Sequence, residues 1–154
     1  MAETVQSRLT ALGIVLPTPP APQANYIPTT RSGGLVFVSG QVSIVPGGKQ
    51  YLGKVGAAVS VEQGREAARA AAINVLAVLK MALGDLDKVK RVLKLVGFVN
   101  CTADFTDMPK VVNGASDLLV EVLGERGKHA RSSLGVNSLP LGVSVEVEVI
   151  VEAA

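Results

Sequence analysis

The order of elements read from the sequence predicts an α/β (α+β) protein with a single mixed sheet of about five to six strands and two helices packed on one sheet face. Apolar residues at helical spacing fill 60–83 and 109–123. Segments rich in β-branched residues precede, separate and follow these two stretches. The 154 residues, of which 48% are hydrophobic, suffice for a buried core. We therefore expect one domain spanning 1–154.

The N-terminal part, residues 1–24, is expected to lie outside the core at 25–152. Its residues 3–12 have the spacing of a short helix. The proline-rich stretch that follows, 16–28, favours extended backbone, so it should run over the surface as a strap. The core then begins with two strands joined by a glycine turn, at 26–31 and 35–42.

The two long helices have recognisable ends. Ser60 and Gln63 form a capping box at the start of the first helix, and Gly84 stops it. Asp107 is the expected cap of the second helix, with Pro109 in its first turn, where the missing N–H costs nothing. Between the helices, alternation predicts a strand over about 91–100.

The C-terminal segments 128–136 and 143–151 are predicted as a hairpin that closes at 137–142. Strand alternation places five valines of the second segment on one face, which should pack on the helices. The hairpin register would set Arg131 opposite Glu148 and Ser133 opposite Glu146 on the other face, with His129 beside them.

Arg131 is the candidate functional residue of this region, because a guanidinium in a largely apolar strand must find an anion. One alternative is an ion pair with Glu146 or Glu148 on a solvated face. The other is a ligand carboxylate in a cleft covered by another subunit, where a partly dry glutamate would act as a base. His129 is either a proton-transfer group or simply packed. The spacing leaves these alternatives open.

Composition excludes several classes of function. A net charge of +2 and 3% aromatic residues argue against nucleic acid or membrane partners. One cysteine, Cys101, and one histidine cannot supply a usual zinc site, and no glycine-rich phosphate loop is present. We therefore expect no metal and no cofactor. The absence of an apparent signal peptide, a membrane span or a possible internal disulfide leads us to expect a cytoplasmic protein.

The stretch HARSSLGVNSLPLGVSVEVEVIV (129–151) resembles the C-terminal signature of the Rid family, also called YjgF or L-PSP endoribonuclease. The family motif joins Ala-Arg-Ser, a small residue, Leu-Pro and a strand that alternates Val or Ile with Glu. Three further pieces fit at the right places: LVFVSGQ at 35–41, FVN followed by DF at 98–105, and Val112-Asn113. The resemblance spans about 25–152, and the longer N-terminus is similar to one branch of the family.

This resemblance implies a chorismate-mutase-like fold, a homotrimer and ligand clefts between subunits. It implies hydrolysis of 2-imino or 2-enamino acids to 2-keto acids and ammonia. By position, Arg131 would hold the substrate carboxylate and Glu146 would position or activate water. The cleft would further include Tyr26, Gly40, Asn113 and Ser133, with His129 and Glu148 as additional candidates. Ser133 stands where many members have Cys, and His129 where many have Pro.

Two other functions remain as alternatives. The first is a trimer that binds a small carboxylate without catalysis, which would need Arg131 equally. The second is an endoribonuclease, for which the basic cluster at 88–94 would contact phosphates; such lysines more often protect a strand edge. Both the hydrolase and the non-catalytic carboxylate-binding protein need Arg131, so its presence does not separate these two hypotheses.

Overall fold

The computed structural model describes residues 2–22, 24–48 and 50–154. The helices are α1 (Val5–Ala11), α2 (Val61–Leu83) and α3 (Met108–Leu123), with short 3₁₀ turns η1 (Leu86–Lys88), η2 (Gly124–Gly127) and η3 (Pro140–Gly142). The strands are β1 (Thr29–Ser32), β2 (Leu35–Val42), β3 (Val89–Asn100), β4 (Ala130–Val136) and β5 (Val145–Ala153).

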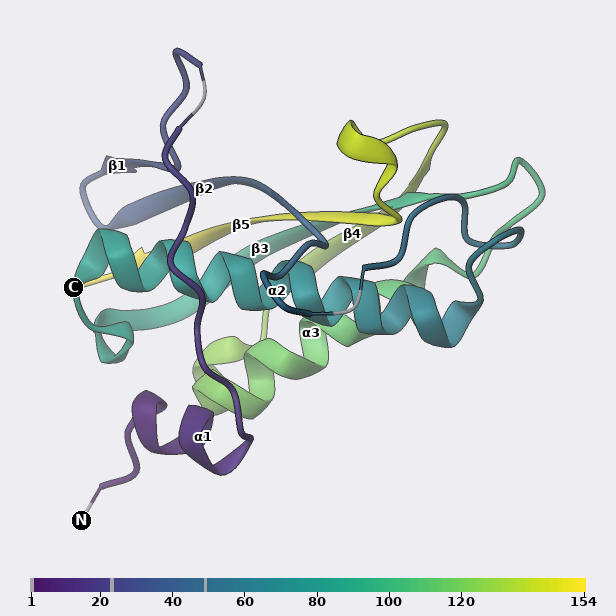
Figure 1. Cartoon of the computed structure of the whole chain (residues 1–154). Helices are drawn as coiled ribbons and strands as arrows, with labels where there is room; N and C mark the ends of the chain where they lie inside the picture. Colours follow the sequence, from purple (N-terminus) through teal and green to yellow (C-terminus); the bar gives the residue numbers. More distant parts are fainter. Residues whose placement is uncertain (1, 23, 49) are drawn as a thin grey trace.

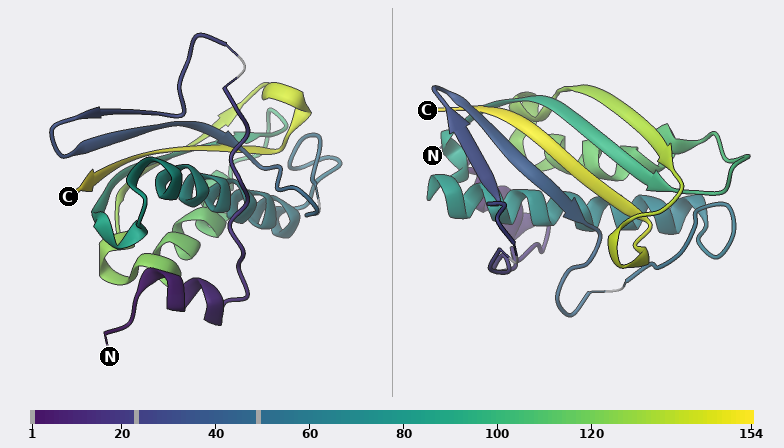
Figure 2. Two further views of the ribbon diagram at one scale, coloured as in Figure 1. Left: turned by 60° about the vertical axis from the view of Figure 1, so that its left-hand side comes forward. Right: turned by 90° about the horizontal axis from the view of Figure 1, so that it is seen from above.

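The strands form one sheet in the order β1-β2-β5-β3-β4. Neighbouring strands are antiparallel except β3 and β4, which are parallel. Helices α2 and α3 lie side by side beneath one face, and no α-helix formed by the described residues covers the opposite face (Figure 1). The view from above shows that open face with all five strands crossing it (Figure 2). The expected α+β architecture with one mixed sheet is thus confirmed.

The valines of β5 form the centre of the core. Val145, Val147 and Val151 are fully buried and Val149 is nearly so, as the alternation predicted. Their side chains meet the alanine-rich side of α2, whose small residues let the helix approach the sheet closely. Residues of the intervening positions, including Glu146 and Glu148, therefore point to the open face.

The N-terminal segment packs on the helical layer. Thr4 and Ser7 form a capping box at the start of α1, and Val5 and Leu9 of this helix are buried in the core. The following strap runs along the outside of α2 before it reaches β1 (Figures 1 and 2). Its residues 17–20, three of them prolines, line one cavity with Asn74 and Ala77 of α2. The predicted helix and strap are both present, although β1 begins at Thr29 and leaves Tyr26 outside the strand.

The predicted C-terminal hairpin is wrong. Strand β5 inserts between β2 and β3, and β4 pairs only with β3, with Arg131 next to Leu95 in register. The physical reason is the helix between β3 and β4: a strand–helix–strand crossover brings the second strand in parallel beside the first. The segment between β4 and β5 is then a connection across the end of the sheet rather than a tight turn.

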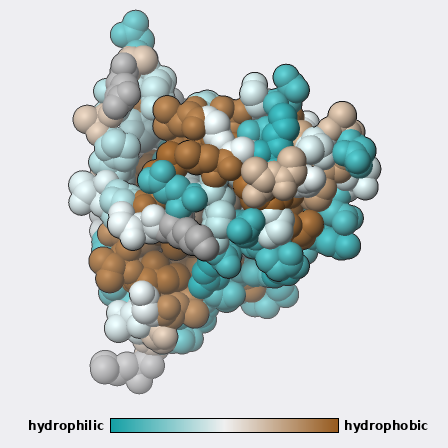
Figure 3. All heavy atoms as spheres, turned by 45° about the vertical axis from the view of Figure 1, so that its right-hand side comes forward, coloured by the Kyte–Doolittle hydropathy of each residue, from teal (hydrophilic) through white to brown (hydrophobic). Residues whose placement is uncertain are grey.

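Apolar side chains gather in patches on the surface (Figure 3). Two of the large exposed apolar residues lie on the open sheet face: Phe37 of β2 is 41% exposed and Leu134 of β4 is 46% exposed. Both alternate with neighbours that face the helices, so neither can reach the core. None of the helices formed by the described residues has the length and apolar character that crossing a membrane would demand.

Candidate functional site

Arg131 lies on the helix side of the edge strand β4, beside α3. Its Nη1 donates hydrogen bonds to Asn113 Oδ1 at 2.8 Å and to Ser116 Oγ at 3.2 Å, and both acceptors are neutral. An arginine carries five N–H donors, so the three on Nη2 and Nε have no partner within the described ranges. Arg131 is half-buried. It therefore presents an oriented guanidinium fork with the geometry that binds a carboxylate in a bidentate manner.

A short hydrogen-bonded chain supports this guanidinium from behind. Ser116 Oγ lies 2.9 Å from His129 Nε2, and His129 Nδ1 lies 2.6 Å from the Gly127 carbonyl oxygen. Because that carbonyl can only accept, Nδ1 carries a proton. In the neutral ring Nε2 then accepts from the Ser116 hydroxyl, whose oxygen accepts from Arg131. His129 thus lies just before β4 with both ring nitrogens engaged.

Ser133 follows Arg131 on the same side of β4 and lies beside Gly97 of β3. Its hydroxyl oxygen is buried and has no hydrogen-bond partner, unlike every other buried side-chain oxygen or nitrogen in the part of the chain described. A buried polar atom without a partner is costly unless a ligand or water completes it. Arg131, Asn113 and Ser133 therefore form one group, which we call the arginine group.

Glu146 belongs to a second group on the open face of the sheet. It pairs in register with Val42 of β2 and Phe98 of β3. Gly40 lies in a β-bulge of β2, and a Cβ placed on it would come 2.1 Å from Glu146 Oε1. A glycine is therefore required here for the carboxylate to lie against the strand.

Burial of the Glu146 carboxyl raises its pKa above the ordinary glutamate value, and the nearby negative charge of Glu148 raises it further. Glu148 lies two residues along β5 on the same face and is exposed. A carboxylate with a raised pKa is a better proton acceptor than one in water. Glu146 thus has the electrostatic character of a general base.

Tyr26 lies close in sequence to a segment bonded to the bulge. Ser39 donates from its hydroxyl to the Ile27 carbonyl at 2.7 Å, and its N–H donates to the Pro28 carbonyl at 2.9 Å. This pairing brings the segment that holds Tyr26 beside Gly40. The Tyr26 side chain is 56% exposed. Tyr26, Gly40 and Glu146 form what we call the glutamate group.

The two groups lie on opposite sides of the sheet, which corrects the expectation that Arg131, Ser133 and the glutamates share one face. Arg131 lies beside Leu95, which faces the helices, whereas Glu146 lies beside Phe98 on the open face. Within one chain, therefore, no ion pair joins Arg131 to Glu146 or Glu148. The first alternative, an arginine neutralised by its own glutamates, is excluded.

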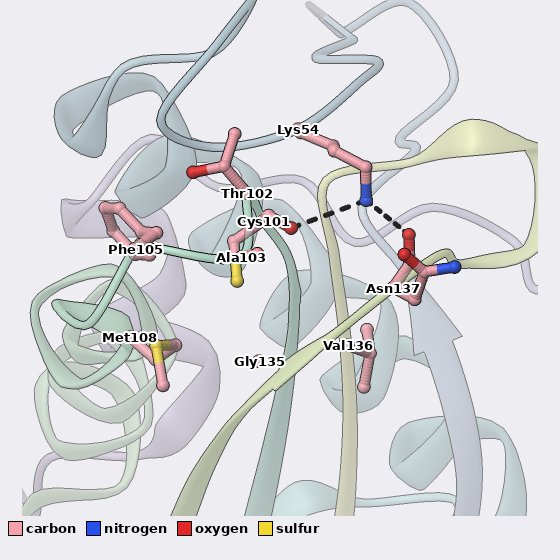
Figure 4. Close-up of a pocket in the computed structure, with 9 residues that line it drawn as sticks. All are labelled: Lys54, Cys101, Thr102, Ala103, Phe105, Met108, Gly135, Val136 and Asn137. Carbon is pink, nitrogen blue, oxygen red and sulfur yellow. Dashed lines mark hydrogen bonds between the residues drawn. The ribbon is translucent and has the colours of Figure 1, made fainter.

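A cavity of about 630 Å³ opens beyond the arginine group, at the end of β4 (Figure 4). Sequence reasoning missed it, along with Ser116. The position of Ser116 carried a signal, since it lies three residues after Asn113 on the same side of α3. No pattern in the sequence indicates the cavity, because its residues come from three separate segments. They are Lys54, Cys101, Thr102, Ala103, Phe105, Met108, Gly135, Val136 and Asn137.

This fold, with two polar groups on opposite sides of one sheet, defines a small α+β protein of the chorismate-mutase-like class. The model of the family described as YjgF/chorismate mutase-like, putative endoribonuclease matches residues 6–152. The chain belongs to this family, which confirms the resemblance of its C-terminal motif.

Individual proteins agree with this assignment. Protein TCP17 from Trypanosoma cruzi is 47% identical over 149 residues, which are 96% of this chain and 93% of TCP17. The crystal structure of Atu1372, a protein of unknown function from Agrobacterium tumefaciens, matches with a TM-score of 0.91 and 46% identity over 97% of this chain and 92% of that one. A putative endoribonuclease from Shewanella oneidensis matches with a TM-score of 0.93 and 37% identity, over 97% and 99%.

Proposed function

We propose that the protein hydrolyses 2-imino and 2-enamino acids to 2-keto acids and ammonia, in clefts between the subunits of a homotrimer. The observation that carries this proposal is the guanidinium fork of Arg131. It is oriented by neutral partners and leaves three N–H groups for a ligand carboxylate. The reaction needs no cofactor, because the imine carbon is already electrophilic.

The separation of the two groups supports a site made from two copies of the chain. Arg131 and Glu146 serve one substrate only if the open face of one copy covers the β4 edge and α3 of another. The exposed Phe37 and Leu134 on that open face favour such a partner, since apolar residues on a sheet face mark interaction surfaces. A head-to-tail contact of this kind closes into a ring when the rotation between copies divides a full turn, and we propose the closed trimer that the family resemblance implies.

In the proposed mechanism, Nη2 and Nε of Arg131 bind the substrate carboxylate and fix the C2 carbon. Glu146 of the neighbouring copy accepts a proton from a water molecule, whose oxygen adds to C2. The C=N bond becomes a single C–N bond, and the nitrogen takes up the proton that Glu146 had accepted. The C2 hydroxyl then passes its proton, by way of Glu146, to the amine nitrogen as the C–N bond breaks, which releases ammonia and the keto acid and leaves Glu146 as a carboxylate. Most of the rate gain comes from orientation of water and imine.

Other residues of the two groups complete the cleft. Asn113 and Ser116 hold the guanidinium, and the unpartnered Ser133 hydroxyl is available to the substrate. Tyr26 would cover the ligand from the neighbouring copy. We place the reaction in the cytoplasm, where amino acid metabolism generates such imines and where Cys101 stays reduced.

The direct test generates an imino acid in situ with an amino acid oxidase and traps the remaining imine with semicarbazide. The protein should lower the trapped fraction well below that of oxidase alone. Equal trapping with and without protein, together with Arg131-dependent binding of 2-ketobutyrate by calorimetry, would instead identify a binding protein. Cleavage of single-stranded RNA by the same preparation, unaffected by Arg131→Ala, would favour the endoribonuclease.

Glu146→Gln is expected to stabilise the folded protein at neutral pH while it lowers hydrolysis. The folded-state pKa of Glu146 is raised by burial and then by Glu148, so its ionisation opposes folding. That penalty grows as pH rises from the ordinary glutamate value to the folded pKa and is absent below about pH 4, where both states are protonated. Urea unfolding at pH 7 should therefore show a gain for the variant that disappears near pH 4.

Glu148→Gln is the matched control, because it removes the second cause of the raised pKa and leaves Glu146 in place. The acid limb of its pH–rate profile should move to lower pH. An unchanged limb in Glu148→Gln, or a Glu146→Gln variant no more stable at pH 7 than at pH 4, would contradict this description of Glu146.

Ser116→Ala is expected to raise the KM for imino acids about 3- to 10-fold, the effect of one hydrogen bond, with little change in kcat. The serine holds Arg131 and connects it to His129, so its loss loosens carboxylate binding rather than the chemical step. Ser116→Thr keeps the hydroxyl and should restore most of the affinity. Steady-state kinetics of the three proteins test this, and a fall in kcat alone would assign the serine a different role.

A further inference from the structure

His129 is connected to Arg131 through a single oxygen atom. Its Nε2 lies 2.9 Å from Ser116 Oγ, and Arg131 Nη1 lies 3.2 Å from the same oxygen. Two hydrogen bonds to one atom place the imidazole and guanidinium nitrogens roughly 6 Å apart or less. Histidine changes its charge between about pH 5 and 8, whereas arginine stays a cation. A second positive charge therefore forms behind Arg131 when His129 is protonated.

The two charge states of His129 use the serine differently. In the neutral ring, Nδ1 donates to the Gly127 carbonyl at 2.6 Å, so Nε2 has only a lone pair and the Ser116 hydroxyl donates to it. In the imidazolium, Nε2 also carries a proton, so the serine oxygen accepts from both cations. Arg131 then shares its acceptor with a second positive charge. An anion on the free N–H groups of the guanidinium relieves the repulsion between the two charges.

No other charged group among the described residues is bonded to this chain of hydrogen bonds. The ionisable side chains of the elements around it, α1, α3 and η2, and that of Lys128, have ion-pair partners of their own. These ion pairs are Arg8–Glu3, Lys110–Asp107, Asp117–Arg65, Glu121–Arg69, Arg126–Asp87 and Lys128–Glu125. Lys94 of the adjacent strand β3 donates to Ser132, on the open face. The charge of His129 therefore acts first on Arg131.

We infer that His129 is a positioning residue for the substrate carboxylate, and that its protonation strengthens the binding of that carboxylate by Arg131. The inference rests on the proposed function, since it takes a carboxylate to lie on the guanidinium. A bound anion then favours the imidazolium, and the imidazolium favours the bound anion by the same factor. Because the groups are half-buried and partly screened, affinity should rise about 3- to 10-fold between about pH 8 and about pH 6.

Calorimetric titration with 2-ketobutyrate, a stable product, tests this inference. Glu146 has a raised pKa and adds a pH dependence of its own, so the titrations are repeated in the Glu146→Gln background. There the affinity should still rise as pH falls, and buffers of different ionisation enthalpy should reveal proton uptake on binding. His129→Gln keeps an oxygen that accepts from Ser116 but is not protonated in this range. In the same background it should bind with the affinity of the His129 protein near pH 8 and show neither effect.

Lys128→Gln is the matched control, because it removes the exposed cation next to His129 in the chain. It should leave the pH dependence and the proton uptake unchanged. His129 is the single histidine of the chain, so nitrogen NMR follows its ring directly in case His129→Gln does not fold. The spectra should show the neutral ring protonated on Nδ1 near pH 8. Near pH 6.5 the protonated fraction should be larger with 2-ketobutyrate bound than without it.

The failure of this inference is distinguishable from the failure of the proposed function. Arg131-dependent binding that is equally tight near pH 8 and pH 6 in the Glu146→Gln background, with no proton uptake, would overturn the inference and leave the proposed function standing. A His129→Gln variant that keeps the full pH dependence would do the same. No binding of 2-ketobutyrate at any pH would overturn the inference and, together with an absence of imine hydrolysis, the proposed function as well.

Discussion

Arg131→Ala is expected to lower kcat/KM for imino acids at least about 100-fold, because a bidentate guanidinium–carboxylate contact both binds the substrate and orients its C2 carbon. Among the described residues this guanidinium has no charged partner, since its two contacts are the neutral Asn113 and Ser116. The loss should therefore appear in function far more than in stability. The assay is imine hydrolysis measured with semicarbazide trapping.

Arg131→Lys is the matched variant. It keeps the positive charge but replaces the planar fork with a single ammonium, so it should recover affinity only in part. Thermal unfolding of both variants should stay within a few degrees of the parent protein, as expected for the loss of about two hydrogen bonds. Hydrolysis by Arg131→Ala at the parent rate would show that the guanidinium does not hold the substrate.

Local patterns predicted the elements of this fold well. The capping box of Ser60 and Gln63 marks the start of α2, and Pro109 lies in the first turn of α3. The valine alternation of β5 identified the core face correctly. Each of these features depends on neighbours close in sequence, so periodicity and capping rules suffice to find it. Asp107 occupies the cap position of α3 without a side-chain hydrogen bond to the N–H groups of the first turn, and its carboxylate accepts from Lys110 Nζ instead.

Periodicity and capping rules do not predict which strands pair with one another. Alternation says which residues share a face of their own strand, but not which strand lies beside it. Adjacency in sequence predicts a hairpin for the two C-terminal segments. The pairing of β4 with β3 instead follows from the intervening α3. That one error in partner placed Arg131 and Glu146 on the same face, whereas the structure separates them.

In the candidate site, too, some residues can be predicted from local sequence and others cannot. Chemistry alone singles out Arg131, because it is a charge in a largely apolar strand. Asn113, Gly40 and Tyr26 came from the family resemblance, because a solvated amide, a bulge glycine and a loop tyrosine carry no signal by themselves. The bulge that puts Gly40 against Glu146, and the cavity at Lys54, depend on contacts between distant segments. Such contacts are fixed only by the tertiary fold.

A mixture of Arg131→Ala and Glu146→Gln subunits should regain activity that neither variant has alone. Each cleft is proposed to take Arg131 from one copy and Glu146 from the next. The structure motivates this by placing the arginine group on the helix side of β4 and the glutamate group on the open face. In a mixed ring some clefts receive an intact Arg131 from the Glu146→Gln subunit and an intact Glu146 from the Arg131→Ala subunit.

Subunit complementation is therefore the most direct measurement of the central claim. The two variants are unfolded together, refolded at equal amounts and assayed for imine hydrolysis, with each variant refolded alone as the control. Random assembly into a cyclic oligomer predicts about a quarter of the parent activity per subunit, and sedimentation should give the mass of three chains. A mixture no more active than its separate components, or a monomer in sedimentation, would contradict a cleft built from two copies.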